Sequence, residues 1–425
     1  MKRIIAAAIV AFMGLASLLD AHAQVPAGLH MEGVTVRNVS GDRVVFAGIN
    51  VEMYRDYDNG CGYVTDGTYA IRSVMADRIK ALGVNAVRLN YSFRFLNQSS
   101  NLTRFLDMAT EFAQRGIYVM PADHSYTSGV LTNSSAAYPM MKQIVDGMRE
   151  RGLENYLIMG GFNEPGPDIS VSAWARAYQN LLTYLRNTAA FQGIVVIDGT
   201  SWSTLLDIDA FKALQAFDAT LRGSAANVLF SNHLYPNITG LPAQIFDAAN
   251  QVPLMIGELG QENPGTSPLR PQYVRDVISA FFNVGMANGH NGLFAWIWAW
   301  CDSNAMLDDD WVDANGQPSN VPYTDKSPLT SHGVLWRDNY YSKLGGLIPP
   351  PAVTSQPTAT RTPTRTPRAT ALPTNTRPTA TRTDPPVIIV TNTPAPSPTC
   401  DAMLEQTGKF NGRDAVFTTC VRYAN

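Results

Sequence analysis

Short apolar runs and longer amphipathic runs alternate along the chain from residue 44 to residue 300. The short runs have the β-branched and aromatic composition of buried strands, and the longer runs repeat apolar residues with helical spacing. The predicted strands comprise residues 44–51, 84–90, 117–124, 155–165, 193–202, 226–236, 252–260 and 291–300. A helix is expected after each strand, and the last of them is expected near residues 334–344.

Strict alternation of strands and helices predicts a parallel sheet, because each crossover helix returns the chain to the same end of the sheet. Eight such units within residues 24–347 favour a (β/α)8 TIM barrel over a doubly wound sheet. A dinucleotide-binding sheet would carry a glycine-rich phosphate turn after its first strand, and residues 48–56 (GINVEMYRD) do not form one. The predicted fold class is therefore α/β, with a barrel as the catalytic domain.

Both ends of the chain differ in composition from the barrel. Residues 1–23 combine Lys2 and Arg3 with an apolar run and a small-x-small cleavage site, which predicts a secretory signal peptide. Residues 348–399 are mostly Pro, Thr and Arg and predict a disordered linker. Residues 400–425 form a short tail with two cysteines and a turn at residues 411–412, which we interpret as a remnant or the opening of a carbohydrate-binding module.

Charge and cysteine content narrow the class of protein. The net charge of −3 gives no reason to expect nucleic acid or an anionic membrane as a partner, and no run after the signal is long enough to span a bilayer. We expect a secreted monomer whose core, rather than its 4 cysteines, provides the stability. Cys61 follows the first strand and Cys301 ends the eighth, so barrel closure makes this pair a candidate disulfide.

Polar and aromatic residues gather where the apolar runs stop. In a barrel of this kind, the active site lies at the carboxyl ends of the strands. The residues at those ends are Arg88, Asn90, Asp123, His124, Asn163, Glu164, His233, Tyr235, Glu258, Trp298 and Trp300. Each of them alone could be a structural residue with a satisfied side chain. Their convergence from six strands onto one rim predicts a functional site.

Two carboxylates stand out in this set. Glu164 ends the fourth strand and Glu258 the seventh, on opposite sides of the barrel mouth. Proline at position 165 stops the strand at Glu164. Two facing carboxylates are what cleavage of a glycosidic bond requires, and a retaining mechanism places them about 5–5.5 Å apart. The alternative is a structural ion pair between a rim glutamate and an arginine.

At these residues the chain resembles glycoside hydrolase family 5, the cellulase-type enzymes of the large (β/α)8 glycosidase clan. The motifs that carry the resemblance are VRLN, DH, FNEP, HLYP, IGELG and WAWCD, which occur in the family order, each at its expected strand. The resemblance covers residues 44–300, which is essentially the whole barrel. It implies a retaining glycosidase that needs no metal and no organic cofactor.

The resemblance also implies a role for each site residue. Glu164 is expected to be the acid/base and Glu258 the nucleophile of a double displacement. Arg88 and Tyr235 would hold the nucleophile and keep its pKa low, and His233 would lie beside the two glutamates. His124 would bind the −1 sugar, and Asn163 would form a hydrogen bond with its 2-hydroxyl. An aromatic after the eighth strand would be the sugar platform, and Trp300 matches it best.

Other tryptophans could extend the binding groove. If Trp300 pointed into the core, Trp298 would take its place as the platform. Trp202, at the end of the fifth strand, and Trp311, in the long loop after the eighth, are candidates for further subsites. Each could instead pack a loop.

The substrate is not determined by these motifs. β-1,4-glucan is the first expectation, which makes the protein an endo-β-1,4-glucanase, and β-1,4-mannan is the second. A non-catalytic sugar-binding barrel is disfavoured because both glutamates are present, and the intact site disfavours a surface protein that works through its linker and tail. The acidic loop at residues 308–315 offers oxygen ligands for calcium but lacks the spacing and closing glutamate of an EF-hand, so we expect a solvated loop there.

Overall fold

The protein divides into two compact units, Met1–Pro357 and Thr358–Asn425. The structure, a computed structural model, describes residues 28–53, 69, 72–127, 129, 131, 133–236, 241–262, 268–298, 304–307 and 328–345, together with the backbone of 402–410 and 413–421. The predicted signal peptide, the linker at residues 348–399 and Cys400 lie outside these ranges.

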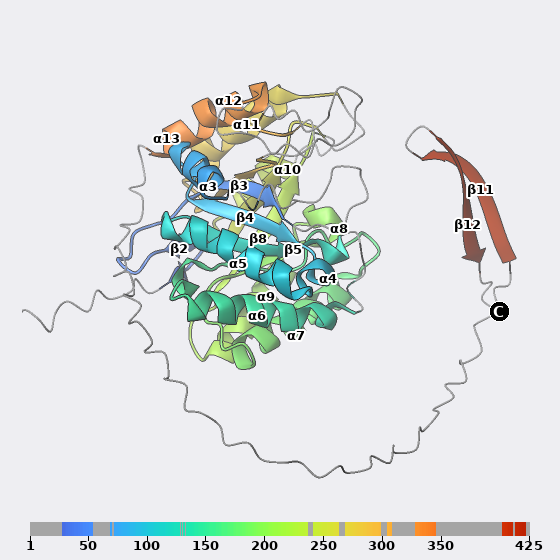
Figure 1. The fold of residues 1–425 in the computed structure, drawn as a ribbon, viewed down its shortest axis with the longest axis horizontal. Coiled ribbons are helices and arrows are strands. Elements are labelled where there is room, and N and C mark those ends of the chain that lie inside the picture. The colour runs from blue at the N-terminus through green and yellow to red at the C-terminus, as the bar shows by residue number, and fades with distance from the viewer. Residues whose placement is uncertain are drawn as a thin grey trace, which may run out of the picture. The chain divides into compact units, whose positions relative to one another are not determined.

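Eight parallel strands form a nearly closed barrel in the first unit, which confirms the predicted fold (Figure 1). They are β3 (Phe46–Glu52), β4 (Ala86–Tyr91), β5 (Tyr118–Asp123), β6 (Met159–Gly160), β7 (Val195–Asp198), β8 (Val228–Leu234), β9 (Leu254–Leu259) and β10 (Gly292–Ala295). The sheet runs from β5 through β4, β3, β10, β9, β8 and β7 to β6. Parallel bridges from Val119 to Leu157 and from Asp123 to Phe162 bring its two edges together.

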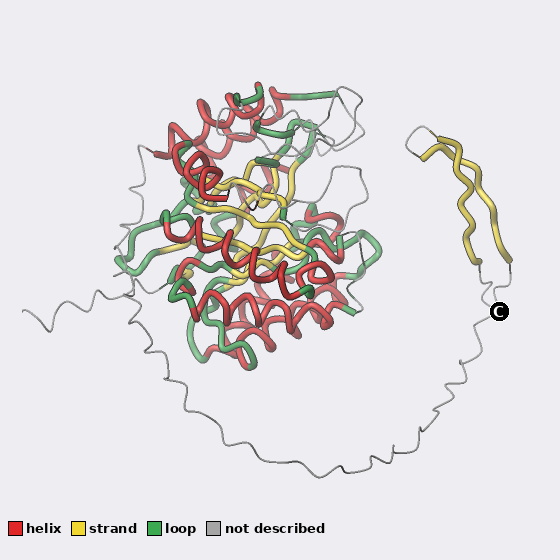
Figure 2. Tube along the Cα trace, viewed as in Figure 1, coloured by secondary structure: helices red, strands yellow, loops and turns green. Residues whose placement is uncertain are grey.

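Helices surround the strands on the outside, as Figure 2 shows. The longer ones are α3 (Arg72–Ala81), α5 (Ser99–Gln114), α6 (Tyr138–Glu150), α7 (Val171–Asn187), α9 (Ile208–Arg222), α10 (Leu241–Ala248) and α11 (Pro271–Ala280), and the shorter ones are α4 (Phe93–Leu96), α8 (Thr200–Ser203), α12 (Ser331–Trp336) and α13 (Ser342–Gly345). The helix expected near residues 334–344 is present as α12, a π-helical turn (Arg337–Tyr341) and α13. Within the described ranges, none of the helices has the length and apolarity that crossing a membrane requires.

The strands bury both faces, one toward the helices and one toward the barrel interior. Along β4, Ala86 belongs to the interior cluster, whereas Val87 and Leu89 belong to the cluster between strands and helices. Because side chains alternate along a strand, Arg88 and Asn90 point into the barrel. The interior is therefore apolar near the start of the strands and polar near their ends.

A short antiparallel hairpin, β1 (His30–Glu32) and β2 (Thr35–Arg37), closes the amino-terminal end of the barrel. Met31 and Val36 pack in the interior cluster, and their backbone N–H groups donate to the Asn227 and Asn291 side chains at 2.9 and 2.8 Å. Both asparagines come just before a strand, so the hairpin covers the floor of the barrel. The alternation of longer runs did not reveal it, because each of its strands has only 3 residues.

The tail forms a hairpin of its own in the second unit, from β11 (Ala402–Phe410) and β12 (Arg413–Val421). Phe410 pairs with Arg413, as a tight turn between them requires, although residues 411 and 412 lie outside the described set. An isolated two-stranded hairpin is marginally stable in water.

One ion pair inside the helical layer gives a test of the fold. Arg186 of α7 donates to Asp218 of α9 at 2.9 Å, and both side chains are buried. Arg186→Ala should lower the free energy of unfolding by about 3–5 kcal/mol, because it leaves the buried Asp218 carboxylate without its counter-charge, with only the Asn227 N–H still donating to it. Arg149→Ala removes an exposed pair with Glu154 and should cost about 1 kcal/mol or less. Urea denaturation of both variants measures the difference, and equal losses would contradict this account.

Candidate active site

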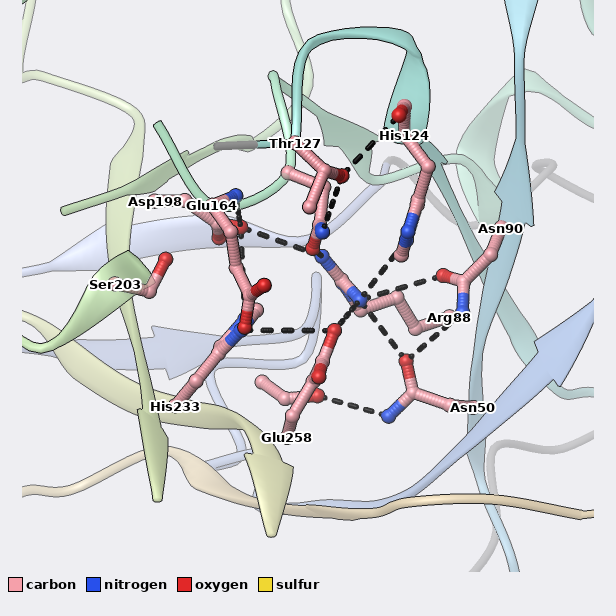
Figure 3. Close-up of polar contacts among 12 residues, drawn as sticks. Asn50, Arg88, Asn90, His124, Thr127, Glu164, Asp198, Ser203, His233 and Glu258 are labelled. Atoms are coloured by element: carbon pink, nitrogen blue, oxygen red, sulfur yellow. Dashed lines mark hydrogen bonds and ion pairs between the residues drawn. The ribbon is translucent and has the colours of Figure 1, made fainter. Parts of the chain in front are cut away.

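Polar side chains from seven strands, β3 to β9, meet at the carboxyl end of the barrel (Figure 3). Arg88 comes from β4, and β9 supplies Glu258. Glu164 follows β6, and His233 belongs to β8. All of these side chains except that of Glu164 are almost completely buried, and Glu164 retains 17% exposure.

A bulge in β9 turns Glu258 into the barrel. Met255 faces the interior and Ile256 the helices, so regular alternation would point Glu258 outward. Instead, Asn232 and His233 on β8 pair with Ile256 and Glu258, which leaves one extra residue on β9. That residue is Gly257, where a Cβ atom would lie 2.3 Å from Ser231 Oγ. Glycine therefore permits the bulge that aims the carboxylate.

Glu164 has an unusual backbone conformation. Its φ of 45° lies in the left-handed region, which costs a residue with a side chain about 1–2 kcal/mol. The Glu164 N–H donates to Asp198 Oδ2 at 3.3 Å, and Pro165 follows. The strand predicted to run to Glu164 ends at Gly160, with one further bridge at Phe162, so the expectation that Pro165 stops it is wrong. The left-handed conformation of Glu164, rather than a strand end, presents the carboxylate toward Glu258.

Arg88 holds the site together. Its Nη1 donates to Glu258 Oε1 at 2.7 Å, and its Nη2 donates to Asn163 Oδ1 at 2.5 Å and to Asp198 Oδ2 at 3.3 Å. Burial opposes its charge, yet the carboxylates of Asp198, Glu258 and Glu164 raise the pKa of Arg88. The guanidinium is therefore a permanent cation in the floor of the site.

His233 connects the two predicted catalytic carboxylates. Its Nδ1 lies 2.8 Å from Glu164 Oε1 and 3.5 Å from Glu258 Oε1, while Nε2 lies 3.5 Å from Asp198 Oδ2. Burial lowers the pKa of His233, but Glu258, Asp198 and Glu164 together raise it above its ordinary value. The three carboxylates therefore favour the protonated ring, which keeps Nδ1 at hydrogen-bond distance from Glu164 and turns Nε2 toward Asp198.

The pKa of Glu258 lies above its ordinary value, mainly because burial disfavours its charge. His233, Arg88 and the Tyr235 hydroxyl, which donates to Oε2 at 2.6 Å, lower the pKa, while the charge of Glu164 raises it. The expectation of a low pKa for this carboxyl is therefore wrong in its net direction. Arg88 and Tyr235 contact Glu258 as predicted and lower its pKa. Glu258 is only 3% exposed, however, and loss of water raises its pKa by more than these partners lower it.

One oxygen of Glu164, one oxygen of Glu258 and a ring nitrogen of His233 all lie within 4.8 Å of one another. Such a set could hold a metal ion. Both Glu258 oxygens already accept hydrogen bonds, however, and the cation of Arg88 lies 2.7 Å from one of them. The arrangement is better suited to proton transfer and nucleophilic attack than to binding a cation. The acidic loop at 308–315 lies outside the described residues.

Two tryptophans near the end of β10 have different environments. Trp296 stacks on His124 with ring centroids 6.3 Å apart and clusters with Tyr235. Trp298 is 2% exposed in the core between strands and helices, with the Arg78 guanidinium of α3 5.7 Å from its ring. The alternative in which Trp298 replaces Trp300 as the sugar platform is therefore wrong, because the Trp298 ring lies in the core. β10 ends at Ala295, so strand alternation no longer holds beyond it.

The remaining predicted residues are placed as follows. Trp202 is 46% exposed, and its backbone N–H donates to the Pro165 carbonyl at 3.0 Å, which holds the Trp202 backbone beside Glu164. Asn163 donates through Nδ2 to Thr127 Oγ1 at 2.9 Å. Trp300, Trp311 and both cysteines of the candidate disulfide, Cys61 and Cys301, lie outside the described residues.

Sequence reasoning missed Asp198, Asn50 and Trp296. Asp198 ends the apolar run of β7, so the rule that identified Glu164 and Glu258 also applies to it. Asn50 lies inside β3, where its Oδ1 accepts from Arg88 Nη1 at 3.0 Å, and no strand end marks it. Trp296 lies inside the predicted strand 291–300, so a search of strand ends does not reach it.

Comparison with known proteins identifies a family. The model for cellulases of glycosyl hydrolase family 5 matches residues 39–304. An endoglucanase catalytic domain from Thermobifida fusca, determined with cellotetraose, is 15% identical; the match covers 73% of this chain and 96% of that chain, with a TM-score of 0.53. Comparison with curated protein sequences finds no match.

Two mannanases have a similar fold. A catalytic domain from Streptomyces sp. SirexAA-E is 19% identical, with 71% of this chain and 90% of that chain covered and a TM-score of 0.50. A β-mannanase from Streptomyces thermolilacinus, determined with mannohexaose, is 20% identical, with 73% and 95% covered and a TM-score of 0.52. At these identities the likeness shows the fold alone.

The family match spans more than half of the 425 residues and includes both glutamates of the site. The carboxylates, the buried arginine and the histidine between them all lie in the matched segment. The chain therefore belongs to the cellulase family, glycosyl hydrolase family 5, and is a glycoside hydrolase.

Proposed function

We propose that the protein is a secreted, retaining endo-β-1,4-glucanase with Glu164 as acid/base and Glu258 as nucleophile. The observation that carries the mechanism is the approach of the two carboxylates to within 4.8 Å. Retaining glycosidases separate their carboxyl groups by about 5–5.5 Å, whereas inverting enzymes leave about 6.5–9.5 Å for a water molecule. The geometry supports attack by Glu258 itself.

In the first step, a Glu258 oxygen attacks the anomeric carbon while Glu164 gives its proton to the glycosidic oxygen. The bond from the anomeric carbon to the leaving sugar breaks, and an ester to Glu258 forms. Tyr235 and Arg88 hold the two Glu258 oxygens, at 2.6 and 2.7 Å, and so fix the direction of attack.

In the second step, water replaces the departed sugar. Glu164, now a carboxylate, removes one proton from the water as its oxygen attacks the anomeric carbon. The ester bond breaks and Glu258 leaves as a carboxylate, so two inversions give net retention. The pair must share one proton at the start of the cycle, and repulsion between the two carboxylates favours that state.

Two tryptophans are proposed to bind the sugars on either side of the bond that is cleaved. Trp296, stacked near His124 and beside Tyr235, supports the proposal that it is the −1 sugar platform, since its indole offers an apolar face to the C–H groups of a pyranose. Trp202 is exposed next to the Glu164 turn, on the side where the leaving sugar must receive its proton. We assign it to the leaving-group side.

Mannan remains the second candidate substrate, because glucan and mannan differ only at C2 of the sugar. The fold is shared with an endoglucanase and with mannanases alike, so it favours neither. Secretion rests on the signal pattern of residues 1–23. We also propose that the protein acts as a monomer on a β-linked polysaccharide and that it uses neither nucleic acid nor a cofactor.

Replacement of either catalytic glutamate tests the mechanism. Glu164→Gln and Glu258→Gln should each lower kcat at least about 100-fold, because one removes the transferable proton and the other the nucleophile. Glu150→Gln, on the exposed face of α6, is the control and should leave kcat unchanged. Release of reducing sugar from carboxymethylcellulose measures the rates, and wild-type turnover in either site variant would sink the assignment.

The hydroxyl of Tyr235 gives a prediction with a definite sign. It lowers the pKa of Glu258, so Tyr235→Phe should raise that pKa and move the acidic limb of the kcat/KM profile to higher pH. The lost hydrogen bond to a charged group should also lower kcat/KM about 10-fold or more. Tyr184→Phe, on α7, should change neither quantity. An acidic limb that stays in place would contradict the contact.

Parallel assays on two polymers decide the substrate. We expect turnover of carboxymethylcellulose to exceed turnover of galactomannan, with product sizes measured by chromatography. Medium-length oligosaccharides early in the reaction indicate endo action. A preference for galactomannan would assign the protein to mannan while leaving the two-carboxylate mechanism intact.

A further inference from the structure

Asp198 is a third buried carboxylate in the site, and the double displacement described above does not use it. It ends β7, between the strands that lead to Glu164 and to His233, and is 4% exposed. A single oxygen, Oδ2, lies 3.3 Å from Arg88 Nη2, 3.3 Å from the Glu164 backbone N and 3.5 Å from His233 Nε2. Figure 3 shows these groups around it.

We propose that Asp198 is a positioning residue that fixes the acid/base Glu164 relative to Arg88 and His233 through this one oxygen. The proposal rests on the proposed function, since it concerns the same reaction. Asp198 is not itself a catalytic residue, because it contacts Glu164 through the backbone and the imidazole rather than through the reacting oxygens.

The first argument is the conformation of Glu164. Its φ of 45° is one that a residue with a side chain rarely adopts, and the only hydrogen bond from its N–H within the described residues goes to Asp198. The side chain is then held at its other end by His233 Nδ1, 2.8 Å from Oε1. The other ring nitrogen, Nε2, lies 3.5 Å from Asp198 Oδ2. Asp198 therefore contacts the Glu164 backbone directly and the Glu164 carboxylate through His233.

The second argument is charge during the reaction. Arg88 is 1% exposed and needs a counter-charge at all times. Glu258 supplies one through Nη1 in the free enzyme, but becomes a neutral ester in the glycosyl-enzyme. Asp198 contacts the other terminal nitrogen, Nη2, and takes no part in the displacement, so this contact does not depend on Glu258. It therefore prevents a buried, unpaired cation in the intermediate.

The surrounding fold holds Asp198 in place. The Trp174 indole of α7 donates to the Asp198 carbonyl at 2.9 Å. The titratable or charged groups that face Asp198 are Arg88 from β4, Glu164 after β6, His233 from β8 and Tyr178 from α7, with Glu258 of β9 behind Arg88. Loss of its negative charge makes each neighbouring proton easier to remove.

Asp198→Asn tests the proposal, because it removes the charge and retains the volume. We expect kcat to fall about 10-fold or more, KM to change little, and the basic limb of the kcat profile to move down by about 0.5 pH unit. Asp207→Asn is the matched control: it loses the same charge nine positions along the chain, but Asp207 caps α9, where asparagine serves equally well. It should leave kcat and the profile unchanged.

A purely structural role predicts a different result. In that case Asp198→Asn lowers the thermal midpoint and the amount of active enzyme, while the pH profile of the remaining activity stays in place. That outcome overturns the proposal, as does a kcat within about twofold of wild type with an unshifted profile.

Titration of His233 by NMR separates this proposal from the proposed function, because it needs no substrate. Asp198 raises the pKa of His233, so the Asp198→Asn variant should titrate at lower pH, with the resonance assigned by its absence in His233→Asn. If wild-type protein cleaves no β-1,4-linked polymer, the proposed function fails while this shift still supports the contact. An unchanged His233 titration overturns the contact whatever the activity.

Discussion

The buried guanidinium of Arg88 is the constraint on which the rest of the site depends. A cation this deep in a barrel is stable only if carboxylates and amide oxygens surround it. It therefore requires acceptors from several strands, and the side chains of Glu258, Asn163 and Asp198 meet that need. Glu258, which pairs with Arg88, is buried away from water, and burial raises its pKa although the ion pair lowers it. The residues that neutralise the buried Arg88 are therefore the same residues that form the site.

The arrangement of strands was predictable from the chain, because eight apolar runs alternate with helices and each ends in polar residues. The strand ends at Arg88, His124, Glu164 and Glu258 were sufficient to predict where the site would form. What periodicity could not predict was the direction of Glu258. In a regular strand it would face the helices, and only the pairing of Glu258 with His233, through a bulge at Gly257, shows otherwise.

The tryptophans and Asp198 show two further limits. Trp298 shares a two-residue spacing with Trp296, yet the strand ends at Ala295 and the two rings enter different clusters. Sequence spacing predicts a common face only as long as the strand continues. Asp198 ends β7, but the strand predicted for residues 193–202 continues past it, so Asp198 is not among the predicted strand ends. Its importance depends on Arg88, which is 110 positions away in the sequence.

The hairpin formed by β1 and β2 bears on the path of the proton in the proposed reaction. Met31 and Val36 pack across the floor beside Phe46 and Phe294, so these side chains of the interior below Arg88 are apolar and offer a proton no acceptor. In the proposed double displacement, Glu164 gives its proton to the leaving sugar and regains one from the attacking water. Both transfers then take place on the side of the site that faces away from this apolar floor, so the catalytic cycle needs no proton path through the barrel.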